Sequence, residues 1–249
     1  MVKREKKARL SFRTEVLSNV ILGIIVFFVA AFCVWSEREV AASGSGEPLY
    51  RNAPKANQSV SLMFNVYWGT EETYQILDIL QSYGVKATFF IGGCWADDNV
   101  ECLRAIANNG HELGNHGYFH KDHTKLSLAD NKKEIENCNR FIFSSMGHTP
   151  TLFAPPSGAY DENTLSAASA LQMKTILWSK DTIDWRDKNP SLIYTRATKN
   201  AEAGDFILMH PTKATVQALP DIIKHYQKQS LGIMTVGENL QIKEQNTTA

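Results

Sequence analysis

From residue 60 onward, short runs of apolar residues alternate with longer amphipathic stretches. The apolar runs have the length and composition of strands and lie at residues 60–67, 86–91, 111–115, 151–155, 174–179, 205–210 and 233–236. Amphipathic stretches typical of helices separate them, at 71–83, 100–109, 127–146, 162–171, 191–200 and 215–229. Strands buried on both faces that alternate with helices predict a parallel α/β sheet or barrel. Seven such strands with six helices favour an incomplete (β/α) barrel over an open sheet.

The N-terminal region has a different composition, a basic tail followed by an apolar run. Residues 1–15 carry six basic and two acidic side chains, and residues 16–35 carry no charged side chain. Crossing a bilayer takes about 20 apolar residues, and basic flanks stay in the cytoplasm. We therefore expect a cytoplasmic tail at 1–15, a single transmembrane anchor at 16–36 and an extracytoplasmic domain at the cell membrane. A cleaved signal peptide, processed near Val40-Ala41-Ala42, is the alternative.

Charge and cysteine content restrict the partners and the covalent structure of the exported part. The formal net charge of the chain is zero, which gives no reason to expect nucleic acid as a partner. One of the four cysteines, Cys33, lies in the apolar run. Cys94, Cys102 and Cys138 are then an odd number without a zinc-binding spacing. A Cys94–Cys102 disulfide and buried free thiols both stay open.

Two histidines, His116 and His120, stand four residues apart just past an apolar run. In a helical turn or a tight loop they can converge on one metal ion, although an HxxxH pair alone is a weak signal. The active residues of (β/α) barrels lie at the carboxyl ends of the strands, where this pair falls. For two neighbouring histidines we expect simpler roles, a solvated loop position for His123 and packing or capping for His111.

Other strand ends also carry polar residues. Asp181 and Asp184 follow an apolar run and can orient a base, bind a metal or simply favour a helix N-terminus. His210 closes another run and can act as a general acid, because the pKa of histidine lies near neutrality. The turn at 153–158 contains two prolines, and backbone N–H groups from Ser157 onward can face a ligand.

The order and spacing of these elements resemble the polysaccharide deacetylase family, the NodB homology domain of carbohydrate esterase family 4. GHELGNHGYFH resembles the family motif GHEIGNHTxxH, FAPPSGAYDENTL the RPPYG segment, LWSKDTIDW the DxxDW segment and ILMH the LxH segment. ILDILQSYGVKATFFIGG is similar to the helix and strand that follow the family's first motif. The resemblance implies a deacetylase-type barrel over residues 59–242. The Ser-, Gly- and Pro-rich residues 37–58 then form a flexible linker, and 243–249 a polar tail.

The resemblance also implies a metal site and a general acid. His116 and His120 would bind a divalent metal, usually zinc, which polarises the acetamide carbonyl and activates a water molecule. His210 would protonate the departing sugar amine. Either Asp181 or Asp184 would orient that histidine and tune its charge.

The substrate residues follow in the same way. Trp185 and Leu208 would line a small apolar slot for the acetyl methyl group. The backbone N–H of Ser157 would be an oxyanion donor, and Pro155 in the same rigid turn would contact the substrate. For a domain exported on a membrane anchor, the nearest such substrate is the N-acetylated glycan of the cell wall.

The family's first motif, TFDDG, is changed here to MFNVYWG at residues 63–69. Asn65 takes the position of the general base and Val66 that of the third metal ligand, yet an amide accepts no proton near neutral pH and an alkyl side chain binds no metal. The arginine that braces the base is replaced by Ala154. In the subgroup that resembles sporulation-type deacetylases a carboxylate follows this loop, which makes Glu71 the candidate substitute. Its simpler role is to stabilise the first turn of the next helix.

Two functions are compatible with this pattern. The first is metal-assisted hydrolysis of N-acetyl groups on peptidoglycan or a chitin-like glycan. The second is a catalytically impaired domain that binds N-acetylated glycan without turnover. The retained histidines and aspartates favour the first, and the missing base favours the second. Because removal of a general base costs about 10²–10⁴-fold in rate, slow hydrolysis is compatible with the altered motif.

Overall fold

The computed structural model describes residues 49–245 of the chain, together with residues 23, 24 and 27. Contacts between residues divide the chain into two units, Met1–Gly46 and Glu47–Ala249. The predicted cytoplasmic tail at 1–15 lies outside the described residues, and so does the predicted anchor at 16–36 except for those three positions. Among the described residues, no helix has the length and apolar character needed to cross a membrane.

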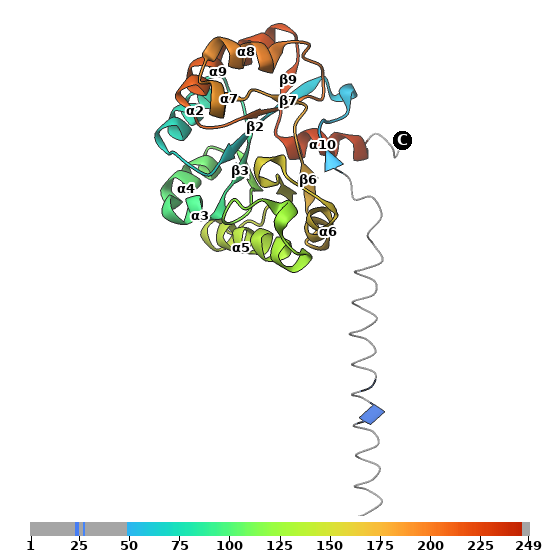
Figure 1. Ribbon diagram of the computed structural model, residues 1–249. Coiled ribbons are helices and arrows are strands. Elements are labelled where there is room, and N and C mark those ends of the chain that lie inside the picture. Colours follow the sequence, from blue (N-terminus) through green and yellow to red (C-terminus); the bar gives the residue numbers. More distant parts are fainter. Residues whose placement is uncertain (1–22, 25–26, 28–48, 246–249) are drawn as a thin grey trace, which may run out of the picture. The chain divides into compact units, whose positions relative to one another are not determined.

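A curled sheet of parallel strands forms the centre of the unit Glu47–Ala249 (Figure 1). The strands, in chain order, are β1 (Leu49–Tyr50), β2 (Ser59–Val66), β3 (Thr88–Ile91), β4 (Glu112–Asn115), β5 (Leu152–Phe153), β6 (Lys174–Ile176), β7 (Lys180–Asp181), β8 (Phe206–Met209) and β9 (Gly232–Ile233). Their order in the sheet is β1-β6-β5-β4-β3-β2-β8-β7, and β9 pairs with β2. Asn52, just after the edge strand β1, forms an isolated bridge to Asp205, just before β8 near the other edge. The sheet therefore curls until its edges nearly meet, which confirms the predicted incomplete barrel.

Helices pack around the outside of this sheet (Figure 1). Six of them match the predicted ranges within a few residues: α2 (Glu71–Ser82), α4 (Val100–Asn108), α5 (Leu128–Met146), α6 (Glu162–Ala170), α8 (Pro190–Thr198) and α9 (Lys213–Lys228). The sequence did not predict the short helices α3 (Gly93–Asp98) and α7 (Asp184–Asp187), because four to six residues carry too little periodicity. Helix α5 is capped at its N-terminus by Ser127, whose side chain accepts a hydrogen bond from the Asp130 N–H (3.1 Å).

Side chains alternate along β2 between two hydrophobic cores. Phe64 and Val66 are fully buried in the larger core, which also contains side chains from α2 and α9. Met63 is fully buried in a smaller core that it shares with Phe90 and other side chains from the barrel strands. Because successive side chains of a strand point to opposite faces, Asn65 lies on the inner face with Met63. This alternation decides which residues of the altered motif can reach the site.

The folded unit is longer at both ends than the sequence indicates. Residues 49–58 were assigned to the linker, but β1 pairs with β6, and the N–H of the buried Ala53 donates to the Gly204 carbonyl (2.8 Å). At the other end, α10 (Val236–Gln245) continues past the predicted boundary at 242. The linker prediction is therefore wrong for residues 49–58, because a two-residue edge strand is too short to outweigh a Pro- and Asn-rich composition.

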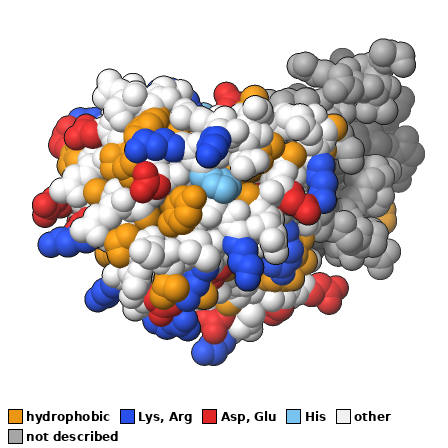
Figure 2. All heavy atoms as spheres, turned by 90° about the horizontal axis from the view of Figure 1, so that it is seen from above, with side chains coloured by type: hydrophobic (Ala, Val, Ile, Leu, Met, Phe, Trp, Pro, Cys, Tyr) orange, Lys and Arg blue, Asp and Glu red, His pale blue; other side chains and the backbone are white. Residues whose placement is uncertain are grey.

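One face of the described surface carries a mixture of charges. Figure 2 shows basic, acidic and hydrophobic side chains interspersed over the face that is seen from above. This mixture agrees with the formal net charge of zero. Opposite charges interspersed in this way give no sustained field over this face that would attract a polyanion.

The three cysteines of the folded unit are free thiols, so the Cys94–Cys102 disulfide does not form. Cys94 is exposed, whereas Cys102 and Cys138 are buried. Burial raises the pKa of Cys102 to about 11 and that of Cys138 to about 12. Both buried thiols therefore stay protonated at neutral pH and act as packing groups.

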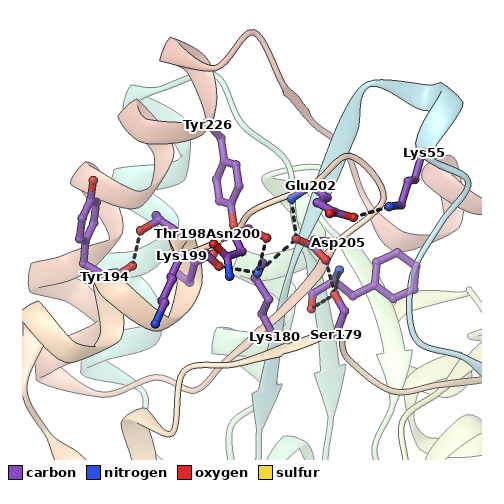
Figure 3. A network of polar contacts seen from close by, with 12 residues as sticks. Lys55, Ser179, Lys180, Tyr194, Thr198, Lys199, Asn200, Glu202, Asp205 and Tyr226 are labelled. Carbon is purple, nitrogen blue, oxygen red and sulfur yellow. Dashed lines mark hydrogen bonds and ion pairs between the residues drawn. The ribbon is translucent and has the colours of Figure 1, made fainter.

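A polar network joins the start of β8 to the end of α8 (Figure 3). The Lys180 ammonium donates to the carbonyls of Lys199 (2.8 Å) and Asn200 (3.0 Å) and pairs with the Asp205 carboxylate (3.5 Å). Asp205 also accepts hydrogen bonds from the Ser179 hydroxyl (2.7 Å) and the Glu202 N–H (2.9 Å). Side chains of Lys180 and Asp205 are only 12% and 13% exposed, so this ion pair is shielded from solvent.

Replacing Lys180 by Met should lower the free energy of unfolding by about 3 kcal/mol, because it leaves the Asp205 carboxylate and two carbonyls without their cation. The matched control is Lys199→Met, since Lys199 contributes only its carbonyl to the network and its side chain is exposed. That control should change stability by less than about 0.5 kcal/mol. Urea unfolding of both variants measures the difference, and equal losses would show that the network does not stabilise the fold.

Candidate active site

A pocket of about 260 Å³ opens at the carboxyl ends of the strands. Its lining consists of Asn65, Tyr67, His116, His120, Ser157, Trp178, Asp181, Trp185, Leu208 and His210. These residues come from segments far apart in the sequence, and each lies within the last two residues of a strand or in the segment that follows one. Of the site residues predicted from the sequence, Pro155, Glu71 and Asp184 do not line this pocket.

His116 is fully buried, and its two ring nitrogens have different surroundings. Its Nδ1 lies 2.7 Å from the Ala154 carbonyl oxygen, which can only accept, so Nδ1 carries the proton. Its Nε2 is buried without a hydrogen-bond partner among the described residues. Burial holds the pKa of His116 well below its usual range. The ring is therefore neutral, with the lone pair of Nε2 unused, which is the form that binds a metal.

His120 is brought beside His116 by a turn with left-handed backbone. Gly117 has φ 72° and His120 has φ 52°, so the segment is a tight loop and not a helix. The two ring centroids lie 5.1 Å apart, and both rings line the pocket. Among the described residues, no group of three His, Cys, Asp or Glu side chains converges to hold a metal. The donor set thus fits a metal held by two nitrogens, and it lacks the third protein ligand of an ordinary catalytic zinc site.

His210 and Asp184 form a hydrogen-bonded dyad at the end of β8. The His210 Nδ1 lies 2.8 Å from Asp184 Oδ1, and the His210 backbone N–H donates to Asp184 Oδ2 (2.6 Å). The fully buried Asp184 also accepts hydrogen bonds from the Thr215 hydroxyl and the Trp185 N–H. Of the two aspartates that the sequence left open, Asp184 is therefore the one that contacts His210. Asp181 lines the pocket instead and accepts from the Ile183 N–H (2.8 Å).

The predicted substrate residues lie around the mouth and the wall of the pocket. Trp185 is 52% exposed, whereas Leu208 is almost fully buried at 2%. Ser157 has φ 56°, in the short 3-10 turn η3 (Pro156–Gly158), and lines the pocket. Pro155 caps this turn and is buried, so it supports Ser157 from outside the pocket lining.

Of the two altered acidic positions in the first motif, 65 and 66, only Asn65 lines the pocket. Asn65 is 2% exposed, and its Oδ1 has no hydrogen-bond partner among the described residues. Val66 points into the outer core, and Ala154 is buried in the inner one. The candidate substitute Glu71 is exposed in the first turn of α2, where it accepts a weak hydrogen bond from Gln75 (3.4 Å). The structure does not bring Glu71 into the site, which leaves its helix-stabilising role.

Tyr67, Trp68 and Trp178 belong to the site and were missed from the sequence. The rings of Tyr67 and His120 are stacked with centroids 3.6 Å apart, and those of Trp68 and His210 with centroids 5.3 Å apart. Trp178 lines the pocket beside Gly158. The spacing of two between Asn65 and Tyr67 was the available signal, because residues i and i+2 of a strand share a face.

The expectation of a solvated His123 is wrong. His123 is fully buried in the turn η2 (His123–Lys125), its Nδ1 is hydrogen-bonded to the Asn131 side chain, and its ring packs on Phe153. Burial lowers its pKa. The polar residues around it, KDHTK, suggested a surface loop, but the following helix α5 covers it. His111 packs on Phe89, as expected.

Comparison with known proteins agrees with this architecture. The sequence profile of the polysaccharide deacetylase family matches residues 52–176. An uncharacterized protein of Bacillus subtilis, YlxY, is 38% identical over 192 residues, which are 77% of this chain and 60% of YlxY. A peptidoglycan-N-acetylglucosamine deacetylase of Bacillus cereus is 32% identical, over 70% of this chain and 85% of its own length. The chain spans less than two thirds of several relatives, and only 41% of a Listeria monocytogenes deacetylase.

A solved structure adds a likeness of a different kind. A CE4 family pseudoenzyme from Bacillus anthracis superposes with a TM-score of 0.76 and 33% identity, over 78% of this chain and 69% of its own. A mutant of that pseudoenzyme with restored enzymatic activity superposes equally well, with a TM-score of 0.76 and 31% identity over 78% and 71% of the two chains. From the profile, the relatives and the barrel with its strand-end histidines, this chain belongs to the polysaccharide deacetylase family of carbohydrate esterases.

Proposed function

We propose that the folded unit hydrolyses N-acetyl groups of cell-wall glycan, and does so slowly. The observation that carries this proposal is that His116 and His210 line one pocket, each with its ring fixed by a hydrogen bond through Nδ1. His210 is oriented by a buried carboxylate, and His116 presents an unprotonated, unpartnered Nε2. An acetamide placed between them would have a proton donor on one side and a site for an electrophile on the other. Related proteins named as peptidoglycan deacetylases make cell-wall glycan the substrate class.

The side chains of this unit would divide the work of amide hydrolysis. Leu208 and Trp185 would pack around the acetyl methyl, and the Ser157 N–H would face the carbonyl oxygen. His210, held through Nδ1 by Asp184, would deliver a proton from Nε2 to the departing sugar nitrogen. A divalent metal, zinc in the first place, would be held by His116 and His120 and would supply carbonyl polarisation and a more acidic water.

The slow rate follows from Asn65. The group at this position faces the pocket but cannot remove a proton from water, because an amide is not a base near neutral pH. The same observation favours the second candidate function, the binding of N-acetylated glycan without turnover. The likeness to a CE4 family pseudoenzyme supports that alternative. In either case we expect the unit to lie outside the membrane, where this glycan is found, carried by the N-terminal anchor.

Acetate release from chitooligosaccharide or peptidoglycan, in the presence of zinc, tests the proposal. We expect a slow release that falls by about 10²-fold in His210→Ala, which removes the proton donor. Zinc binding should be lost in His116→Ala and kept in His210→Ala, because only His116 belongs to the metal pair. Binding of the oligosaccharide by calorimetry without any acetate above the His210→Ala level would select the second candidate. If the chain neither binds the oligosaccharide nor releases acetate, both candidate functions are contradicted.

A further inference from the structure

Tyr67 occupies the middle of the pocket. Its ring is stacked face to face on His120, with centroids 3.6 Å apart and planes inclined by 23°. The same ring lies 5.7 Å from the centroid of His116 and 6.4 Å from that of His210. Tyr67 therefore stands among all three histidines that the proposed function uses, and its side chain is partly exposed to solvent.

Gly92 makes this position possible. A Cβ on residue 92 would lie 2.9 Å from the Cβ of Tyr67, closer than real Cβ atoms approach one another. The φ of Gly92 is −75°, which any residue can adopt, so glycine is needed here for space and not for backbone conformation. The absence of a side chain at position 92 lets Tyr67 sit against the barrel.

The loop that carries Tyr67 is fixed from behind. Trp68 packs against His210 with the two rings nearly parallel, at 11°. The indole N–H of the buried Trp95, in α3, donates to the carbonyl of Gly69 (2.9 Å). On the other side of Tyr67, the Val66 carbonyl accepts a hydrogen bond from the Gly92 N–H (2.9 Å). With the backbone held on both sides, Tyr67 would leave His120 by turning its own side chain.

We propose that Tyr67 is a stopper: its ring covers His120 and must turn away before a metal ion with its remaining ligands, or an acetamide group, can occupy the pocket. This inference rests on the proposed function for the identity of those ligands. Both rings line the pocket, so the space that Tyr67 fills is the space in front of the metal-binding pair. The stopper adds to the missing base as a second cause of low activity.

The test uses three variants of the folded chain. Tyr67→Ala removes the stopper, and Tyr67→Phe keeps the ring and removes only the hydroxyl. Gly92→Ala places a methyl group against the Cβ of Tyr67 and should displace its side chain. Tyr74→Ala is the matched control, because Tyr74 is exposed on α2 and does not line the pocket. The first readout needs no metal: the rate at which diethyl pyrocarbonate modifies His120, followed by peptide mass spectrometry. The second is the zinc affinity, measured by titration calorimetry.

We expect Tyr67→Ala to raise both the modification rate of His120 and the zinc affinity by about tenfold, the upper range for the loss of one aromatic stack. Gly92→Ala should change both in the same direction, while Tyr67→Phe and Tyr74→Ala should match the wild type. An unchanged rate and affinity in Tyr67→Ala and Gly92→Ala would overturn the stopper. Weaker zinc binding in both Tyr67→Ala and Tyr67→Phe would also overturn it, since the phenol would then be a ligand. If His116→Ala binds zinc as well as the wild type, the metal part of the proposed function fails, and the modification rate alone judges the stopper.

Discussion

Asn65→Asp is expected to raise acetate release from N-acetylated chitooligosaccharide by about 10²–10⁴-fold over the wild type, the usual contribution of a general base. The reason is local. Asn65 lies on the inner face of β2, and its Oδ1 has no hydrogen-bond partner among the described residues. Its side chain lines the same pocket as His116, whose Nε2 is unprotonated. A carboxylate of nearly the same shape would therefore stand where a water molecule must be deprotonated.

The control for this rescue is the neighbouring substitution Val66→Asp. Val66 points into the outer core, so an aspartate there would be buried among apolar side chains and should destabilise the chain without adding activity. The double variant Asn65→Asp with His210→Ala should lose the gain, because the leaving amine would have no proton donor. If Asn65→Asp binds zinc and glycan but releases no more acetate than the wild type, the missing base is not what limits this site.

Acid should destabilise this fold strongly between pH 6.5 and pH 4. Burial, with a smaller contribution from Lys86, lowers the pKa of His111 to about 4. Between the two pKa values the unfolded chain binds a proton that the folded chain does not, so the free energy of unfolding falls as the pH falls. A shift from 6.5 to about 4 corresponds to about 3 kcal/mol for this residue, present in full above pH 6.5 and lost near pH 4. Burial also lowers the pKa values of His116, His120 and His123, which adds to the loss in the same direction.

Urea unfolding at pH 7.5, 6, 5 and 4 measures this dependence in the metal-free chain. In the folded chain, the Nδ1 of His111 accepts the Ala87 N–H (3.2 Å), and a glutamine can accept the same hydrogen bond without titrating. His111→Gln should therefore lose about 3 kcal/mol less than the wild type between pH 6.5 and 4. His148→Gln, at an exposed position, should leave the pH profile unchanged. An unaltered profile in His111→Gln would contradict the assignment of a buried neutral imidazole at this position.

The sequence predicted the barrel well because strand and helix periodicities are local properties. Six helices and the longer strands lie where their patterns indicated. The motif resemblance predicted that His116, His120 and His210 share a site, and all three line one pocket. What the sequence could not predict depends on packing between distant segments. The stacking of Tyr67 on His120 depends on the register of β2 against β3 and on the close approach of Tyr67 to Gly92, and the sequence shows neither of these contacts. The burial of His123 was not predicted for the same reason, because the polar residues next to it in the sequence do not indicate that helix α5 covers it.

The alternation along β2 has a consequence for how such a protein can change over generations. Residues 64 and 66 are constrained by the core, whereas residue 65 is constrained only by chemistry in the pocket. A substitution at 65 can therefore switch turnover off, or on again, while the barrel keeps its stability and its ability to hold a ligand. In a strand built this way, catalysis and folding are under separate selection. A lineage can therefore lose the reaction and still keep the folded domain and its binding surface for another use.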